Sequence, residues 1–124
     1  MATTASLDTK ETTSLIASDR VEGTAVYGAD QKKIGSVEHV MIDKITGKVA
    51  YAVLTFGGFM GIGSDYFPVP WSMLRYDTML GGYKVSLTKD QLDRAPKYGS
   101  DSDWDWTREN DRRVYDYYKA TPYC

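Results

Sequence analysis

The sequence predicts a mainly β protein, a small antiparallel β-barrel with one short helix and a C-terminal α-helix. Three observations support this class. Residues 49–56 ("VAYAVLTF") are largely apolar at both sets of alternate positions, as in a central strand. The apolar spacing in residues 33–43 requires a β-bulge, which bends a strand as a barrel needs. After Pro96 the pattern changes to one typical of helices.

The N-terminal part of the chain is expected to contain little regular structure. Residues 1–14 are rich in threonine and serine and are expected to be a disordered lead-in. They contain neither the basic nor the apolar segment of a signal peptide, so we expect none. In residues 15–21, Ser18 is expected to cap a single helical turn. Residues 23–28 ("GTAVYG") are expected to form a brief strand.

A longer strand is expected over residues 33–43 ("KIGSVEHVMID"). Its apolar residues are Ile34, Val37, Val40 and Ile42. A spacing of three cannot keep side chains on one face of a flat strand, because the side-chain period of a strand is two. A β-bulge near Glu38 and His39 would restore the register. The sequence therefore predicts an irregular ladder at this point.

The strongest pair of strands surrounds a hairpin turn at residues 43–48 ("DKITGK"). Gly47 can supply the positive φ that a hairpin turn followed by a bulge needs. The next strand, residues 49–56, is apolar on both faces and should lie centrally in the sheet.

Four glycines between residues 57 and 63 resemble a phosphate-binding loop at first sight. A Walker loop needs a lysine after its last glycine, whereas Ser64 and Asp65 follow Gly63 here. A dinucleotide-binding loop needs the order G-x-G-x-x-G at the start of a helix, whereas the order here is G-x-x-G-x-G and Pro68 follows. We therefore expect a connection between two strands.

The following segments are expected to be an edge strand and a last strand. In residues 65–71 ("DYFPVPW"), Pro68 and Pro70 cannot donate ladder hydrogen bonds, which favours an edge position. Residues 83–87 ("YKVSL") are expected to form the last strand, which is entered through a turn at residues 80–82.

Two helices are expected at the C-terminal side. Thr88 and Gln91 form a T-x-x-Q capping box, so a short helix should begin there and end at Ala95, before Pro96. A second helix is expected over residues 107–120, with Thr107 or Asp105 as N-cap. Its apolar face should contain Val114, Tyr117 and Tyr118, with Tyr115 beside them.

These elements divide the chain into segments. The predicted segments are a lead-in at 1–14, a barrel domain at 15–96, a linker at 97–106, a helix at 107–120 and a tail at 121–124. Aromatic residues are concentrated in the C-terminal part and form the candidate partner-binding set. Its members are Trp104, Trp106, Tyr115, Tyr117 and Tyr118. They either pack onto the protein's own barrel or form a surface for a partner or a second copy, since tryptophan and tyrosine are enriched at interface hot spots. The two interpretations are not exclusive.

Candidate catalytic and metal-binding residues are few. His39 is the only histidine, and Cys124, the last residue, is the only cysteine. A histidine-based metal site, a serine–histidine relay and a disulfide framework are therefore not expected. The alternate acids Asp101, Asp103 and Asp105 lack the glycine and the distal glutamate of a calcium-binding loop. We expect no catalytic site, no metal and no cofactor.

Composition narrows the class of partner. The chain has 124 residues, enough for one domain, and a formal net charge of −2. This charge balance does not suggest a nucleic-acid-binding surface, which usually requires a basic patch. Glycines interrupt the uncharged run from residue 49 to residue 64, so we expect no membrane span. We expect a cytoplasmic protein.

Several short motifs, taken together, carry a resemblance to a known family. In chain order they are Gly35-x-Val37-x-x-Val40-x-Ile42-Asp43 with Gly47, then Val49-x-Tyr51-x-Val53, then Gly57-Gly58, and finally Val69-Pro70-Trp71. Residues 15–96 resemble the PRC-barrel domain, which is named after the cytoplasmic domain of the photosynthetic reaction-centre H subunit. The resemblance implies a small, highly curved PRC-type β-barrel in which the glycine stretch connects two strands.

The resemblance also implies a class of function. In this family the domain is not an enzyme but an adaptor, for example in the ribosome maturation factor RimM, where it binds a ribosomal protein. The chain looks like the stand-alone bacterial type with a helical C-terminal extension. We expect a non-enzymatic interaction module that binds an unidentified protein and forms a homodimer through strand edges or the C-terminal helix. The alternatives are a barrel that binds a small ligand between Tyr51, Tyr66 and Trp71, and a RimM-like ribosome assembly factor.

Overall fold

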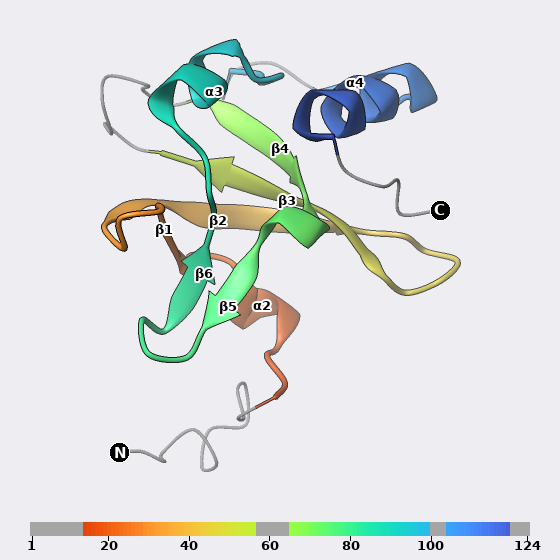
Figure 1. The fold of residues 1–124 in the computed structure, drawn as a ribbon. Coiled ribbons are helices and arrows are strands. Elements are labelled where there is room, and N and C mark those ends of the chain that lie inside the picture. Colours follow the sequence, from red (N-terminus) through yellow and green to blue (C-terminus); the bar gives the residue numbers. More distant parts are fainter. Residues whose placement is uncertain (1–13, 57–64, 100–103, 120–124) are drawn as a thin grey trace.

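The computed structural model describes residues 14–56, 65–99 and 104–119. These residues form a six-stranded sheet with short helices packed against it, which confirms the mainly β class (Figure 1). The strands are β1 (Ala25–Tyr27), β2 (Lys33–Ile42), β3 (Val49–Thr55), β4 (Tyr66–Pro70), β5 (Arg75–Asp77) and β6 (Gly82–Lys84). The helices are α2 (Ser18–Val21), the 3₁₀ turn η2 (Trp71–Met73), α3 (Lys89–Arg94) and α4 (Arg108–Tyr118).

The strand order across the sheet is β4-β3-β2-β1-β6-β5. All neighbours are antiparallel except β1 and β6, which run parallel, so the prediction of a wholly antiparallel sheet was wrong. Parallel neighbours require a long connection, and here four strands separate β1 from β6 along the chain. Sequence-local patterns do not indicate such a distant pairing.

The predicted bulge in β2 is confirmed. Val37 pairs with Leu54 and His39 pairs with Val53, so Glu38 is the extra residue on β2. An extra residue of this kind locally disrupts the ladder and bends the strand that carries it.

The start of β2 also approaches β3 unusually closely. A Cβ atom at Gly35 would lie 2.0 Å from the backbone oxygen of Thr55, so only glycine allows this approach. The β2–β3 turn is as predicted: Gly47 has φ +78° and its N–H donates to the backbone oxygen of Asp43 at 2.8 Å. The Asp43 carboxylate closes the turn by accepting from the N–H of Ile45 at 2.8 Å.

The predicted positions of the two best-marked strands are confirmed. β3 is flanked by β2 and β4 and is buried from Ala50 to Leu54. β4 lies at the end of the sheet, as Pro68 and Pro70 predicted. Side chains of both strands form the core together with residues from α2, α3 and α4, which include Val21, Leu92 and Val114.

The sheet is strongly curved, but its closure is not confirmed. Between the ends of β4 and β5, opposite edges of the sheet, lie only η2 and Leu74. The rings of Trp71, at the start of η2, and Tyr83, on β6, lie 5.3 Å apart. The two ends therefore approach each other, yet β4 and β5 share no ladder among the described residues. Closure into a barrel stays a prediction.

The short helices test the predicted caps. Ser18 was predicted to cap α2 but is its first helical residue, and the N-cap Ala17 has no side chain able to accept a hydrogen bond. The capping box of α3 is confirmed: the Gln91 N–H donates to Thr88 Oγ1 at 3.1 Å, and the Thr88 N–H donates to Gln91 Oε1 at 2.8 Å. Of the two candidate caps of α4, Thr107 is the N-cap.

Two further differences concern the last strands. β5 was not predicted, and β6 ends at Lys84 rather than at residue 87. Val85 and Leu87 are nevertheless buried, which explains the strand-like apolar pattern.

The glycine stretch at 57–63 lies outside the described residues, although β3 and β4, the strands on either side of it, pair antiparallel. Residues 1–13 of the predicted lead-in, residues 100–103 of the predicted linker and the predicted tail also lie outside the described residues.

Candidate functional site

Helix α4, which carries three of the predicted partner-binding residues, packs against β4 and the neighbouring core. Val114, Tyr115 and Tyr118 are buried, whereas Tyr117 is only partly buried. The sequence predicted Tyr117 on the buried face and Tyr115 beside it. In the structure Tyr115 is buried and Tyr117 is only partly buried. In Figure 1, α3 and α4 lie on the same side of the sheet, near β4. The helix is part of the fold of the described chain.

Tyrosine hydroxyls attach α4 to its neighbours. Tyr51 on β3 donates to the carboxylate of Asp111 at 2.6 Å, and Tyr115 donates to the backbone oxygen of Ala50 at 3.1 Å. Tyr117 donates to the backbone oxygen of Gln91, in α3. Each bond satisfies a polar atom at the edge of an otherwise apolar contact.

The two predicted tryptophans continue this aromatic contact. Trp106 lies 5.1 Å from the ring of Tyr51, and Trp104 lies 5.7 Å from the ring of Tyr98. Both tryptophans are partly buried against the core. The structure thus places the candidate partner-binding residues in one group of neighbouring side chains. This group packs largely against the protein itself. Whether they also bind a partner stays a prediction.

The predicted linker contains residues that cover the edge of β4. Tyr98 forms a β-bridge with Tyr66: the Tyr66 N–H donates to the Tyr98 oxygen at 2.7 Å, and the Tyr98 N–H donates to the Tyr66 oxygen at 3.0 Å. Burial raises the pKa of Tyr98, and Tyr66 and Glu38 raise it further. Residues 97–99 therefore extend the sheet for a short distance beyond β4.

The residues predicted to line a barrel mouth each contact other aromatic rings. The ring of Tyr51 contacts Trp106 and Tyr115, Tyr66 contacts Tyr98, and Trp71 contacts Tyr83. Tyr51 instead lines a small cavity of about 110 Å³ between the β2–β3 hairpin and α4. The lining residues of this cavity are Met41, Ile42, Asp43, Ala50, Tyr51, Trp106 and Asp111. A ligand site built jointly by Tyr51, Tyr66 and Trp71 stays a prediction.

An open groove of about 590 Å³ lies where the end of α3 faces α4. Its lining residues are Arg94, Ala95, Pro96, Lys97, Arg113, Asp116 and Tyr117. Of these, only Tyr117 was among the predicted site residues. The basic residues are separated in the sequence and follow no motif, so their convergence could be found only from the packing of the two helices. We call this feature the α3–α4 groove.

One buried hydroxyl in α4 has no partner among the described residues. The Tyr118 hydroxyl accepts and donates no hydrogen bond there, and the side chain is buried. Burial raises the pKa of Tyr118 strongly, and the nearby Tyr117 raises it further. An ionised Tyr118 would thus be a costly, unpaired charge in the core.

The described residues show neither a metal-binding cluster nor a membrane-spanning helix. The described segments contain no group of three or more histidine, cysteine or acidic side chains placed to hold a metal ion. His39 lies in the ladder of β2 opposite Val53. No described helix is long and apolar enough to span a bilayer.

Comparison with known proteins agrees with this architecture. A family model of the PRC-barrel domain matches residues 14–92, which include all six strands. A protein from Deinococcus radiodurans, described as an uncharacterized protein, is 34% identical over 79 residues. The aligned region is 64% of this chain but only 28% of that relative. The shared part is thus a module within a longer protein in Deinococcus.

Proposed function

The chain belongs to the PRC-barrel domain family, and we propose that it is a non-enzymatic protein-interaction module that associates with a second copy of itself. The observation that carries the self-association is the outer edge of β5. β5 is the last strand in the sheet order and pairs with β6 on its inner side. The terminal strand of a sheet is the position at which a strand of another chain can be added.

The side chains around β5 are suited to an interface. Tyr76 is 40% exposed and its ring lies 5.2 Å from that of Tyr83, which fixes its position. Met79, at the tip of the β5–β6 hairpin, is 92% exposed. A preformed tyrosine beside an exposed methionine offers apolar surface at low entropic cost. These features support pairing of β5 with the β5 strand of a second copy.

Sedimentation equilibrium at tens of micromolar tests this proposal. We expect a dimer for the natural chain and a weaker dimer for Tyr76→Lys, because the introduced charges would face each other across a symmetric interface. Ile45→Lys is the matched control, since Ile45 is also 92% exposed but lies on the other hairpin. A monomeric natural chain, or equal weakening by both variants, would refute the β5 interface.

The environment of the charged groups supports a non-enzymatic role. No charged side chain is buried in the part of the chain that the structure describes. Catalytic acids and bases usually depend on desolvation and close charges to adjust their pKa values. A reaction that is abolished by replacing a single described carboxylate or lysine, with the fold intact, would contradict this part of the proposal.

The small cavity beside Tyr51 favours a second candidate function, the binding of a small organic cation. It joins the rings of Tyr51 and Trp106 to the carboxylates of Asp43 and Asp111, and no basic side chain lines it. Aromatic rings and carboxylates together favour alkylammonium groups. Thermal-shift measurements with tetramethylammonium chloride test this candidate against Asp111→Asn. A melting temperature that rises no more than with sodium chloride would exclude it.

A further inference from the structure

We propose that the α3–α4 groove binds an acidic peptide segment of a partner protein, one that presents carboxylates beside an apolar side chain. The inference rests on the proposed role as an interaction module and adds the chemistry of the partner. The lining of the groove comes from α3, α4 and residues 95–97, and it includes no residue of β5, the proposed self-association strand. One chain could therefore use both surfaces at the same time.

The charge of the groove is opposite to that of the whole chain. Three basic residues, Arg94, Lys97 and Arg113, line it together with one acid, Asp116. The chain as a whole has a formal net charge of −2. A local excess of positive charge on an acidic protein attracts anionic partners to this place in particular.

Two of the cations are held in position before any ligand arrives. Lys97 Nζ donates to the backbone oxygens of Asp93 at 2.7 Å and Leu92 at 3.3 Å, at the end of α3. An ammonium group has three donors, so one remains for a ligand. Arg113 donates to Asn110 Oδ1 at 2.9 Å, and its guanidinium lies 5.7 Å from the ring of Trp104. Fixed cations lose little side-chain entropy on binding.

The third cation is available for a direct contact. The Arg94 side chain is exposed and lines the groove. A guanidinium binds a carboxylate through two parallel hydrogen bonds, which makes it suited to glutamate or aspartate side chains. The groove thus offers several hydrogen-bond donors to carboxylates. Helix α3 contributes Arg94, and helix α4 contributes Arg113.

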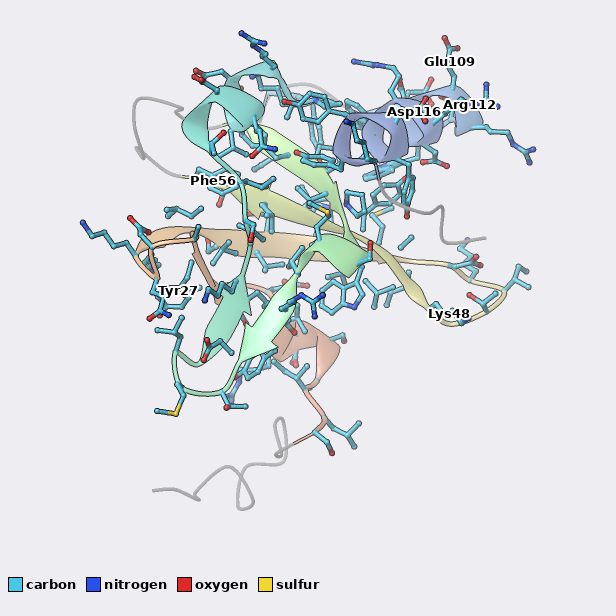
Figure 2. All side chains as sticks on the ribbon, viewed as in Figure 1. Tyr27, Lys48, Phe56, Glu109, Arg112 and Asp116 are labelled. Carbon is cyan, nitrogen blue, oxygen red and sulfur yellow. The ribbon has the colours of Figure 1, made fainter. Side chains whose placement is uncertain are left out.

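The rest of the lining favours a peptide over an isolated anion. Ala95 and Pro96 are buried apolar residues of the groove, and Tyr117 contributes a partly exposed ring whose hydroxyl is already bound to Gln91. An apolar side chain between two acidic residues would contact the exposed part of the Tyr117 ring. Figure 2 shows Glu109, Arg112 and Asp116 together on α4, so acidic groups limit how far a polyanion such as nucleic acid could extend along the helix.

An NMR titration of the isotope-labelled full chain tests the inference. The probe is the capped peptide Glu-Glu-Leu-Glu-Glu, and the matched control is Gln-Gln-Leu-Gln-Gln. We expect amide shifts confined to the groove residues with the acidic peptide and none with the glutamine peptide. No shifts, or shifts spread over the surface, would overturn the proposal, as would equal binding of both peptides or of a short oligothymidylate.

Variants of exposed residues make the test independent of folding. The double variant Arg94→Gln with Arg113→Gln should weaken binding at least about tenfold, the loss expected for hydrogen bonds between charged groups. Asp116→Asn removes the opposing carboxylate and should tighten binding. Lys44→Gln, in the exposed β2–β3 turn, is the matched control and should bind as the natural chain does. Unchanged affinity in the double variant would overturn the proposal.

The same samples separate this inference from the proposed self-association. Sedimentation of each variant reports the dimer, and the titration reports the groove. A dimer that does not bind the acidic peptide would refute only the groove. A monomer that binds it would refute only the β5 interface, and a shift seen only at concentrations where dimers form would assign the groove to a second copy instead.

Discussion

The two edges of the sheet differ in how the protein covers them. β4 is buried at four of its five residues, carries two prolines, and is covered by Tyr98 and by α4. β5 has three residues, of which Arg75 and Tyr76 are exposed, and it is the last strand in the sheet order. One edge is therefore covered by the C-terminal part of the chain, whereas the other consists of a short and largely exposed strand.

This difference changes the role of the C-terminal helix. Its aromatic residues suggest a partner surface when the sequence is considered alone, yet most of them cover β4 and the core. Since an exposed apolar edge would promote aggregation, the cover has a structural purpose. The available surfaces are then the β5 edge and the α3–α4 groove, where only Tyr117 of the aromatic set takes part.

Removing the cover of β4 should have the largest effect. A chain that ends at Pro96 loses the Tyr98 bridge and the buried side chains of Val114, Tyr115 and Tyr118. Burial of each such side chain contributes about 1.5–3 kcal/mol. The sum approaches the whole stability of a typical domain, about 5–15 kcal/mol. We expect loss of the cooperative transition in circular dichroism.

The matched control for this truncation is a chain that ends at Lys119. It keeps all described contacts of α4 and should unfold cooperatively like the natural chain. If the chain that ends at Pro96 also unfolded cooperatively with a similar midpoint, the covered edge would not need its cover. The contrast between the two edges would then have no energetic meaning.

The same substitution at both edges should have a smaller but more specific effect. Val69 on β4 is fully buried, so Val69→Lys would place an unpaired charge in the core and cost more than about 3 kcal/mol. Tyr76→Lys on β5 leaves its charge in water and should cost about 1 kcal/mol or less. Urea denaturation, at protein concentrations too low for dimers to form, measures the loss of stability in both variants. Similar losses at the two edges would contradict the comparison.

Much of the sheet could be predicted because its signals are local. The bulge at Glu38 follows from spacing, the turn at Gly47 from backbone freedom, and the edge position of β4 from Pro68 and Pro70. β5 was missed because three residues, "RYD", are too short to show an alternation. The parallel pairing of β1 with β6 joins distant segments, which no local pattern encodes.

The candidate site was less predictable. On a helix, successive residues are about 100° apart, so Tyr115 and Tyr117 lie on opposite sides of Val114. The sequence pattern allows either tyrosine to face the sheet, and the contact with Ala50 and Tyr51 selects Tyr115. The groove was not predicted because Arg94 and Arg113 meet only after α4 has packed beside α3.

Two tyrosines within the cover should respond differently to loss of the hydroxyl. Tyr115→Phe removes the bond to the Ala50 oxygen and should cost about 0.5–1.5 kcal/mol. Tyr118→Phe removes a buried hydroxyl that has no partner among the described residues, so it should be neutral or slightly stabilising. Thermal and urea unfolding of both variants measure the difference. Equal losses would mean that the Tyr118 hydroxyl also has a bonding partner in solution.

The smallest predicted effect concerns pH and again involves the cover of β4. A tyrosine is neutral below its pKa, which is about 10 in an unfolded chain. Because burial raises the pKa of Tyr118, the unfolded state loses this proton first as the pH rises. The stabilisation from Tyr118 is thus complete below about pH 10 and is lost as the pH rises toward the folded-state pKa.

Tyr98, whose pKa is also raised by burial, acts in the same direction, so alkaline pH should weaken the cover of β4. In Tyr118→Phe the loss of stability above about pH 10 should be smaller by up to about 1.4 kcal/mol per pH unit. Urea unfolding at several alkaline pH values measures this slope. An identical slope in the natural chain and the variant would show that Tyr118 ionises equally readily in the folded state. The covered edge would then admit water to a hydroxyl that the structure places inside the core.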